Sequence, residues 1–521
     1  MKKFLLVAVA VMAVLRLSAQ TTQVTQQLQK LLVAETAITN LYVDEVDEEN
    51  LVESAIVSML EELDPHSSYL NAKEVASSNE KLQGSFEGIG VQFNMVRDTM
   101  VVIQPISGGP SEKVGIVAGD RIVSADDTIL AGVKMTNTQI SSHLRGPKGS
   151  TVKLGVVRQG ISDVIFFNVV RDQIPINTID AAFMAAPGIG YIKISNFGAA
   201  TVSEFETEFD KLSKNGLKSL IVDLQGNGGG YLGAAVGMGN EFLNKDCRIV
   251  YTEGRSSRRT VYSAEGNGKY RKGELVILMD EYSASASEIV AGAVQDWDRG
   301  TVIGRRSYGK GLVQRPVEFP DGSMIRLTVA KYYTPSGRCI QKPYGDDIDY
   351  AHDLETRLLG GELVNADSIH INDTLKYNTL VEKRTVYGGG GIMPDVFVPI
   401  DTTRATSWYR QVTARGIVLQ VCLDYVDHNR VELMRQYKSF DKFKKGFDAG
   451  DELMDRLLKL AEESGIEFVE DEFEKSTKYL TVQLKALVAR NLWSLNEYYN
   501  ILNELNPIYN KALEFLVKKE S

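Results

Sequence analysis

The chain of 521 residues contains little cysteine and little histidine. Its three cysteines are too few and too scattered for a disulfide framework or a zinc site. The five histidines are dispersed, none stands near a glycine-rich segment, and the chain has no H-E-x-x-H motif. The local sequence therefore supports neither a metal centre nor a Ser-His-Asp mechanism.

The chain also has fewer positively than negatively charged residues. The chain has 58 Lys and Arg against 68 Asp and Glu, a net charge of −10. An acidic chain lacks the basic surface that binds phosphates, so no nucleic acid partner is expected. Hydrophobic residues make up 43% and charged residues 24%, which excludes collagen-like and wholly disordered chains. At roughly 100–200 residues per domain, the length predicts three or four domains.

Long apolar runs are missing except at the N-terminus. There a short basic start precedes the apolar residues 4–15, and a small-residue site follows at Ala19. This layout is typical of a secretory signal peptide, and the apolar run is too short for a comfortable membrane span. We therefore predict a signal peptide over residues 1–19 and export to the periplasm or cell envelope, with an uncleaved signal as a membrane anchor or a buried helix as the alternatives.

Four blocks follow, and together they predict a multidomain α/β protein. Residues 20–83 are helical in pattern, with apolar residues at intervals of three and four. Residues 84–171 are glycine-rich and mostly β in character. Residues 172–400 alternate buried-type strands with helices, and residues 401–521 are charged and helix-periodic.

The hydrophobic pattern also predicts individual elements. Helices are predicted at 51–63, 289–297, 453–461 and 484–492. Strands are predicted at 91–93, 100–103, 152–157, 189–194, 219–224 and 275–279.

A glycine-rich segment follows the strand predicted at 219–224. It contains G-x-G-x-x-G as Gly228, Gly230 and Gly233, with Glu253 twenty residues further on, which is the pattern of a dinucleotide-binding loop. The same loop could instead expose backbone N–H groups to an anion or an oxyanion, or could simply be a turn. The residues alone leave these three interpretations open.

A serine-rich turn separates the strand predicted at 275–279 from the next helix. Ser285 with Glu288 three residues on fits a capping box, which starts many helices. A serine at such a turn is also placed to act as a nucleophile. The N–H of Ala286 would then lie at the positive end of the helix dipole, where it suits an oxyanion.

Lys310 stands between two glycines. Most lysines are surface residues, and this one could be as well. A lysine that acts as a general base must be neutral near pH 7, and burial can lower its pKa from ~10.4 by up to ~3–5 units. A serine paired with a desolvated lysine is a known variant of the catalytic triad.

The serine-rich turn and the Gly-Lys-Gly segment occur together with other characteristic segments. These lie at 63–70, 86–91, 118–122, 228–230, 332–338 and 391–395. The combination resembles the carboxyl-terminal processing proteases, also called tail-specific proteases (peptidase family S41). The resemblance extends from about residue 30 to 400.

The resemblance implies a role for several residues. The family's serine and lysine lie about 25 residues apart, a spacing that Ser285 and Lys310 match. Ser285 would be the nucleophile, Lys310 the general base, and Gln314 the residue that orients the lysine. The N–H groups of Gly229 and Ala286 would form the oxyanion hole.

The resemblance also bears on the core and the glycine loop. It implies an α/β core of the ClpP/crotonase type that needs no metal and no cofactor. Gly230 is the neighbouring possibility for the oxyanion hole. The family often has Arg and Pro around this loop, where this chain has Gln225 and Gly228, so the loop could be more mobile here.

The β block resembles a PDZ domain. Its segment Gly88-Ile89-Gly90-Val91 matches the loop that binds a peptide carboxylate. PDZ domains add the C-terminal strand of a peptide to a sheet edge and hold its carboxylate with backbone N–H groups. The resemblance implies that these four residues bind protein or peptide substrates with free apolar C-termini.

The leading hypothesis is an exported serine endopeptidase with a Ser/Lys dyad. A nucleotide-dependent oxidoreductase is a weaker alternative, because an export signal argues against a cytosolic cofactor. A non-enzymatic peptide-binding scaffold is the other alternative, although serine, lysine and glutamine are all intact. The terminal helical regions are predicted to form a homodimer or to dock an adaptor protein, or, for residues 401–521, to cap the chain's own core.

Overall fold

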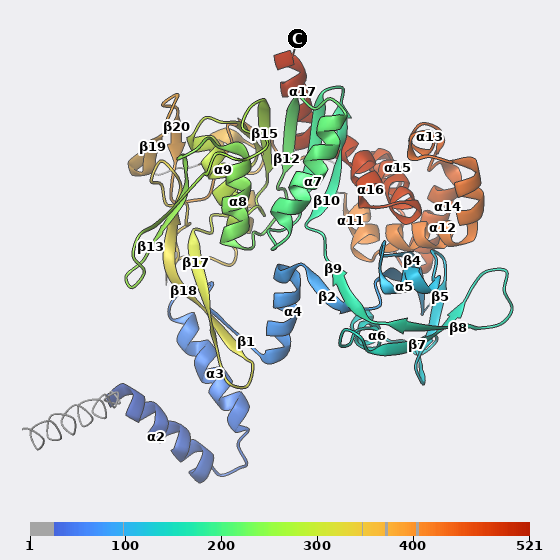
Figure 1. Ribbon diagram of the computed structural model, residues 1–521, viewed down its shortest axis with the longest axis horizontal. Coiled ribbons are helices and arrows are strands. Elements are labelled where there is room, and N and C mark those ends of the chain that lie inside the picture. The colour runs from blue at the N-terminus through green and yellow to red at the C-terminus, as the bar shows by residue number, and fades with distance from the viewer. Residues whose placement is uncertain (1–25, 97, 346, 370–372, 403–405, 521) are drawn as a thin grey trace, which may run out of the picture. The chain divides into compact units, whose positions relative to one another are not determined.

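The computed structural model describes residues 26–96, 98–345, 347–369, 373–402 and 406–520 (Figure 1). The predicted signal peptide lies outside the described residues. The chain forms two compact units, Met1–Ala72 with Pro316–Leu327 and Lys73–Arg315 with Thr328–Ser521. Of the helices in the described ranges, none is both long and apolar enough to cross a membrane.

The smaller unit contains two helices and a short strand pairing. The helices are α2 (Gln26–Leu41) and α3 (Glu48–Glu61), and Asp47 caps α3 by accepting a hydrogen bond from the Asn50 N–H. The helix predicted at 51–63 is thereby confirmed. Strand β1 (Ser68–Leu70) pairs antiparallel with the first residues of β18 (Met324–Tyr333).

Residues 85–175 form the β module, whose main sheet has the order β3-β4-β5-β7-β8. Helix α6 (Asn137–Leu144) contributes Ile140 and Leu144 to the core of the module. Strand β3 lies at the edge of the sheet, because β4 is its one strand partner in the described chain. The strands and remaining helix are β2 (Ser85–Gly88), β3 (Val91–Val96), β4 (Thr99–Pro105), α5 (Pro110–Val114), β5 (Arg121–Ala125), β6 (Thr128–Ile129), β7 (Thr151–Val157), β8 (Ile165–Val170) and β9 (Asp172–Pro175).

A six-stranded sheet of order β10-β11-β12-β15-β16-β21 follows (Figure 1). All its strands are parallel except β10, which pairs antiparallel with β11. Successive residues of β12 pack on opposite faces, so both faces are buried, as apolar parallel strands require. The strands are β10 (Ile179–Ala186), β11 (Ile189–Ile194), β12 (Ser219–Asp223), β15 (Glu274–Met279), β16 (Thr301–Gly304) and β21 (Val396–Phe397).

Helices cover both faces of this sheet. On one face lie α7 (Thr201–Lys214), α8 (Leu232–Phe242) and α9 (Ala286–Asp296), and on the other lies α17 (Pro507–Glu520). The architecture is mixed α/β, and each strand predicted from the sequence is present. The other elements between residues 72 and 400 are α4 (Ala72–Gln83), β13 (Arg248–Glu253), β14 (Thr260–Ser263), β17 (Leu312–Glu318), α10 (Asp353–Leu359), η1 (Ala366–Ser368), η2 (Asp373–Leu375), β19 (Lys376–Asn378) and β20 (Thr385–Tyr387).

Residues 407–505 form a helical block with a hydrophobic core of its own. Its helix α12 contacts β3 of the β module, and its helix α16 contacts β10 of the large sheet. The block therefore packs against other parts of its own chain. Its elements are α11 (Ser407–Ala414), α12 (Ile417–Gln436), α13 (Phe440–Gly446), α14 (Asp451–Glu463), α15 (Glu470–Leu492), α16 (Leu495–Leu502) and η3 (Asn503–Leu505).

Candidate active site

Ser285 occupies the turn between β15 and α9 in a strained backbone conformation. Its φ is 56° and its ψ is −113°. A non-glycine residue in such a region costs about 1–3 kcal/mol and persists only where its surroundings hold it. Ala286, the first residue of α9, has an N–H without an acceptor among the described residues, as expected at a helix N-terminus.

The fully buried Glu288 carboxylate holds this turn. It accepts hydrogen bonds from the N–H groups of Ser285 (2.7 Å), Lys310 (2.9 Å) and Gly309 (2.8 Å), and from the hydroxyl of Ser307 (2.6 Å). The expected capping contact between Glu288 and Ser285 is present. The same side chain also binds the lysine loop, so one carboxylate joins the segments of the predicted nucleophile and base.

Two opposing effects act on the Glu288 carboxyl group. Burial raises the pKa of Glu288 above its ordinary value, although the hydrogen bonds that it accepts oppose that rise. The Ser307 hydroxyl accepts a hydrogen bond from the Ile392 N–H (2.7 Å), so its own proton is available to Glu288. Four donors therefore converge on the two Glu288 oxygens, an arrangement that suits the ionised carboxylate.

Tyr332 makes a second connection between the same two residues. Its hydroxyl lies 2.6 Å from the carbonyl oxygen of Lys310 and 3.0 Å from that of Ser285. The ring is 1% exposed, and burial raises the pKa of Tyr332 well above its usual range. The hydroxyl thus keeps its proton as a donor to these carbonyl groups.

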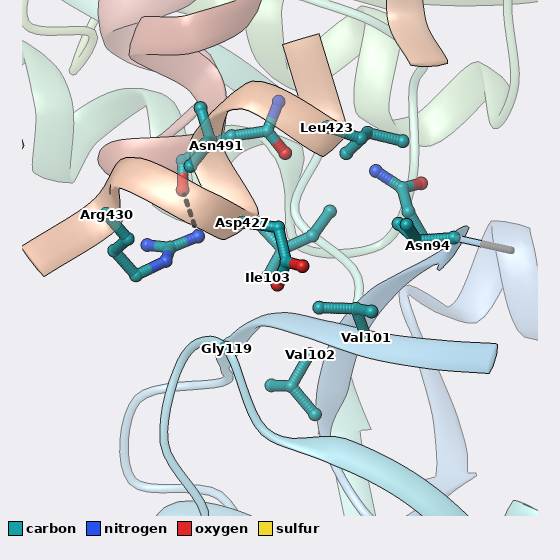
Figure 2. Close-up of a pocket in the computed structure, with 11 residues that line it drawn as sticks. Asn94, Val101, Val102, Ile103, Gly119, Leu423, Asp427, Arg430 and Asn491 are labelled. Carbon is teal, nitrogen blue, oxygen red and sulfur yellow. Dashed lines mark hydrogen bonds between the residues drawn. The ribbon is translucent and has the colours of Figure 1, made fainter. Parts of the chain in front are cut away.

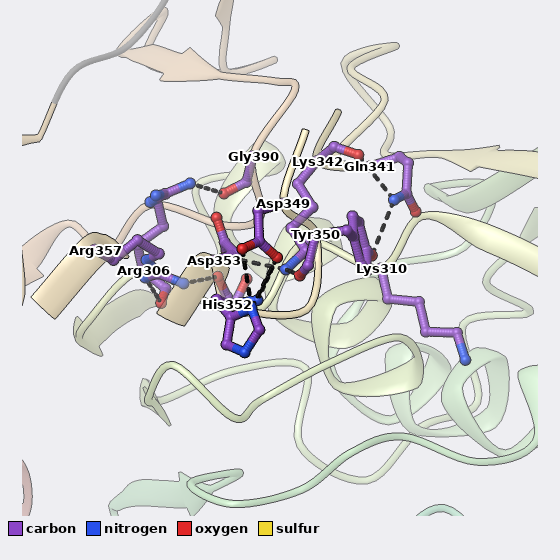
Figure 3. Close-up of polar contacts among 12 residues, drawn as sticks. Arg306, Lys310, Gln341, Lys342, Asp349, Tyr350, His352, Asp353, Arg357 and Gly390 are labelled. Carbon is purple, nitrogen blue, oxygen red and sulfur yellow. Dashed lines mark hydrogen bonds and ion pairs between the residues drawn. The ribbon is translucent and has the colours of Figure 1, made fainter. Parts of the chain in front are cut away.

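The segment around residue 341 supports the lysine loop from another side (Figure 3). The Lys342 N–H donates to the Gly309 carbonyl (2.9 Å), and the Gly311 N–H donates to Oε1 of Gln341 (2.8 Å). Both glycines that flank Lys310 are therefore held through their backbones.

Two lysines lie in this region, but their surroundings differ. The Lys342 ammonium lies 3.0 Å from Asp353 and 4.2 Å and 4.0 Å from the ring centres of Tyr308 and Tyr350. These groups favour a charged ammonium, although burial lowers the pKa of Lys342. In Figure 3 the Lys310 side chain runs away from this cluster.

Lys310 contacts the residue predicted to orient it. Its Nζ lies 3.4 Å from Oε1 of Gln314, and both side chains are half-buried. The two residues are positioned by the start of β17, which begins at Leu312.

The glycine loop brings Gly229 next to Ser285. A Cβ atom at Gly229 would lie 2.7 Å from the Ser285 Cβ and 3.0 Å from the Ala286 nitrogen, so only glycine fits there. The Gly229 N–H, however, donates to Oδ1 of Asn227 (2.8 Å). The two predicted oxyanion-hole residues are adjacent, but one of their N–H groups is engaged within the loop. The neighbouring Gly230 has a φ of 150°, and a Cβ atom there would lie 2.1 Å from the Phe197 carbonyl oxygen.

The dinucleotide pattern is not assembled. Gly233 lies inside α8, and Glu253 ends β13, which belongs to a different sheet from β12. The Glu253 carboxylate pairs with Arg259 (2.7 Å). In a dinucleotide-binding unit the acidic residue must instead reach the ribose from the same sheet as the glycine loop.

The predicted carboxylate loop lies between two strands of the β module. Gly88 ends β2 and Val91 begins the edge strand β3. The Ile89 carbonyl accepts hydrogen bonds from the N–H (3.0 Å) and the hydroxyl (2.7 Å) of Ser111, and Gly90 has a φ of 73°. The loop is thus held at one end of an unpaired sheet edge.

Comparison with known proteins identifies the family. Residues 188–350 match peptidase family S41. The chain is 35% identical over 305 residues to the carboxy-terminal-processing protease of Bartonella bacilliformis, an alignment that covers 58% of this chain and 69% of that protein. The chain belongs to peptidase family S41. Residues 88–164 match the PDZ domain, so the β module is a PDZ domain that precedes the S41 core.

Other relatives and regions extend this picture. The chain is 36% identical over 302 residues to the carboxy-terminal processing protease CtpA of Bacillus subtilis, covering 58% of this chain and 64% of that protein. The chain thus spans less than two thirds of that relative. Residues 8–74 match the N-terminal domain of the activating protease CtpB, and residues 408–494 match a family of unknown function (DUF8443).

Two solved structures are also similar. One is the photosystem II D1 C-terminal processing protease, with 27% identity, a TM-score of 0.36, and coverage of 72% of this chain and 94% of that chain. The other is the PDZ domain of a carboxy-terminal protease from Vibrio cholerae in complex with a peptide, with 30% identity, a TM-score of 0.17, and coverage of 18% of this chain and 99% of that chain.

Sequence reasoning did not give a role to Tyr332, Gln341 or Lys342. Tyr332 stands in one of the segments that resemble the S41 family, but its partners are 22 and 47 residues away. A local pattern cannot indicate such a pairing.

We expect Glu288→Gln to destabilise the S41 core by about 3 kcal/mol or more. The amide would direct an N–H₂ group at two of the four donors, leaving buried polar groups unpaired. The shift in the urea unfolding midpoint measures the loss. The same change at the exposed Glu462 is the control, and an equal, small shift for both variants would contradict the role given to Glu288.

Proposed function

We propose that this S41 chain is an exported serine endopeptidase in which Ser285 is the nucleophile and Lys310 the general base. One observation carries the proposal: Glu288 accepts hydrogen bonds from the N–H groups of both residues, and Tyr332 contacts the carbonyl groups of both. The two segments are therefore positioned as one unit. Such positioning is what a nucleophile–base pair requires.

In the proposed reaction, Ser285 Oγ attacks the carbonyl carbon of the scissile peptide bond while Lys310 Nζ takes the hydroxyl proton. The Ala286 N–H stabilises the negative oxygen of the tetrahedral intermediate. The Gly229 N–H joins it after turning away from Asn227 Oδ1. The protonated Lys310 then gives its proton to the leaving amine, and a water molecule activated by Lys310 releases the acyl group from Ser285.

Gln314 is proposed to orient the base. Its Oε1 is an acceptor 3.4 Å from Lys310 Nζ. An amide oxygen can direct the lysine amine without adding a charge that would raise the pKa of the lysine strongly.

We expect Lys310→Ala and Lys310→Arg to lower turnover of a peptide reporter by about 10³-fold or more. Arginine keeps the charge and size but stays protonated, so it cannot act as a base. Gln314→Ala should cost less, because it removes an orienting contact only. The exposed Lys331→Arg serves as the control.

Labelling adds an independent measurement to this series. A serine-directed acylating reagent should modify Ser285 in the native chain and leave the Ser285→Ala chain unmodified. Substantial turnover by Lys310→Arg, or labelling at another serine, would contradict the dyad.

We further propose that the PDZ domain captures substrate tails. The supporting features are the free edge of β3 and the loop from Gly88 to Val91 at one end of that edge. A peptide with an apolar C-terminus would pair with β3 and place its carboxylate among the loop N–H groups. The bound tail would then favour the active state of the enzyme.

A peptide with a free, apolar C-terminus should therefore raise the turnover of a separate reporter substrate. The amidated form of the same peptide should lose most of this effect, because it lacks the negative charge that the loop N–H groups hold. Reporter cleavage against peptide concentration gives the comparison. Equal curves for acid and amide, or simple competition by both, would show that the domain is not triggered by a carboxylate.

Export is proposed from the N-terminal sequence. The basic start, the apolar run and the small residue at Ala19 form a signal peptide that directs the chain to the periplasm or cell envelope. Sequencing the N-terminus of the protein isolated from its native host tests this. A mature protein that still begins at Met1 and remains in the cytosol would refute the proposal.

Self-association through helix α2 is proposed as well. Several apolar side chains on one side of this helix are exposed, among them Leu31 (50%), Leu32 (55%) and Ile38 (41%). We propose that a second copy of the chain covers this row. Light scattering should show a dimer that Leu31→Glu with Leu32→Glu converts to a monomer, and a monomeric native chain would contradict the proposal.

A further inference from the structure

Strand β4 of the PDZ domain is apolar on both faces. Met100 and Val102 pack into the PDZ core and are fully buried. Val101 and Ile103 point to the opposite face, yet each is only 8% exposed. A PDZ sheet with a solvated outer face would carry polar residues there, so something covers this face.

The cover is helix α12 of the helical block (Figure 2). In the close-up, Val101 and Ile103 lie on the same side of the sheet as α12, and Val102 points the other way. The gap between the two surfaces is a cavity of about 20 Å³, which has room for one water molecule. The lining residues are Asn94, Val96, Val101, Val102, Ile103, Gly119, Leu423, Val426, Asp427, Arg430 and Asn491.

An ion pair fastens the two surfaces. Arg121, at the start of β5, pairs with Asp427 of α12. The Asp427 side chain is only 9% exposed, so this pair is not a fully solvated surface contact. Without Arg121, the largely buried Asp427 carboxylate would lose its ion-pair partner and keep only the electrostatic attraction of Arg430, which is unfavourable.

A second arginine connects this surface to the interior of the block. Arg430 donates to the Asn491 carbonyl of α15 (2.8 Å). Its side chain also passes 3.9 Å from the Cβ position of Gly119, in the PDZ turn before β5. Gly119 has a positive φ of 91°, which glycine adopts without strain. Because glycine has no side chain, the Arg430 side chain can come close to this turn.

The other end of the block is attached to the S41 core. The Ala182 N–H of β10 donates to Oδ1 of Asn496 in α16 (2.8 Å). The chain then continues into α17, whose residues Ile508 and Leu516 pack on the sheet that carries the Ser285 turn. The block thus contacts the PDZ domain at one end and the protease sheet at the other.

We propose that residues 407–505, which include the region of unknown function, are an intramolecular docking platform for the PDZ domain. The platform holds the back of the PDZ sheet through Arg121–Asp427 and the apolar residues of β4. The platform contacts β3 on the face that carries Asn94 and Val96, opposite to the core-facing Val91, Phe93 and Met95, and β3 keeps an edge with no strand partner in the described chain. The docked PDZ domain can therefore bind a tail without being released.

Thiol labelling of the full chain tests this docking. Ile103→Cys places a reporter on the covered face, and Val102→Cys places a matched reporter inside the PDZ core. Peptide-resolved mass spectrometry follows each reporter separately from Cys247, Cys339 and Cys422. We expect both reporters to label slowly in the otherwise native chain.

Breaking the ion pair should release only the covered face. Asp427→Arg should speed labelling of the Ile103→Cys reporter by about ten-fold or more and leave the Val102→Cys reporter slow. Exchanging the charges, with Arg121→Asp added to Asp427→Arg, should restore slow labelling. Glu432→Arg makes the same change on the exposed side of α12, where Glu432 pairs with Arg435, and should have no effect.

Other outcomes would overturn the proposal. A second reporter on the covered face, Val101→Cys, supports the reading of Ile103→Cys. If both label fast in the otherwise native chain, the block is not docked. Slow labelling after Asp427→Arg would show that the ion pair does not fasten the surfaces. Fast labelling after a tail peptide is added would show a latch that substrate releases, not a platform.

Discussion

The buried carboxylate of Glu288 is the interaction on which the active-site architecture depends. Taking an ionised carboxylate out of water is costly, and four hydrogen-bond donors offset that cost. Three of these donors are backbone N–H groups, including those of Ser285 and Lys310. The anchor therefore holds main-chain segments, and the reacting side chains can be replaced without removing any of its contacts.

The strained backbone of Ser285 follows from this anchor. A φ of 56° is unfavourable for serine, so the chain adopts it only because Glu288 holds the Ser285 N–H and Tyr332 contacts the carbonyl. The two contacts hold the two peptide units on either side of the Ser285 Cα atom. The parallel sheet supplies the rest, because β15 and α9 are packed tightly enough to keep the turn between them from relaxing.

The sequence predicted the elements well and the long-range contacts poorly. Apolar runs such as 189–194 and 275–279 predicted buried strands, because two covered faces favour apolar residues at almost every position. The family motifs predicted that Ser285 and Lys310 act together as nucleophile and base. The contacts of Tyr332 and Lys342, and the contribution of 316–327 to the smaller unit, could not be predicted, since each depends on which distant segments meet. The hydrogen bond from the Gly229 N–H to Asn227 could not be predicted either, because it depends on the orientation of a single peptide group.

Strand β4 is apolar on both faces, and this has a consequence for how the protein evolves. Arg121 and Asp427 stand 306 residues apart in the chain, with the whole S41 core between them. If this PDZ domain were transplanted alone into another protein, Val101 and Ile103 would form an exposed apolar patch that favours aggregation. The domain is therefore not an independent module. The PDZ domain and the helical block should instead be gained, lost and altered together over evolutionary time, as two distant stretches of one gene that serve as halves of a single interface.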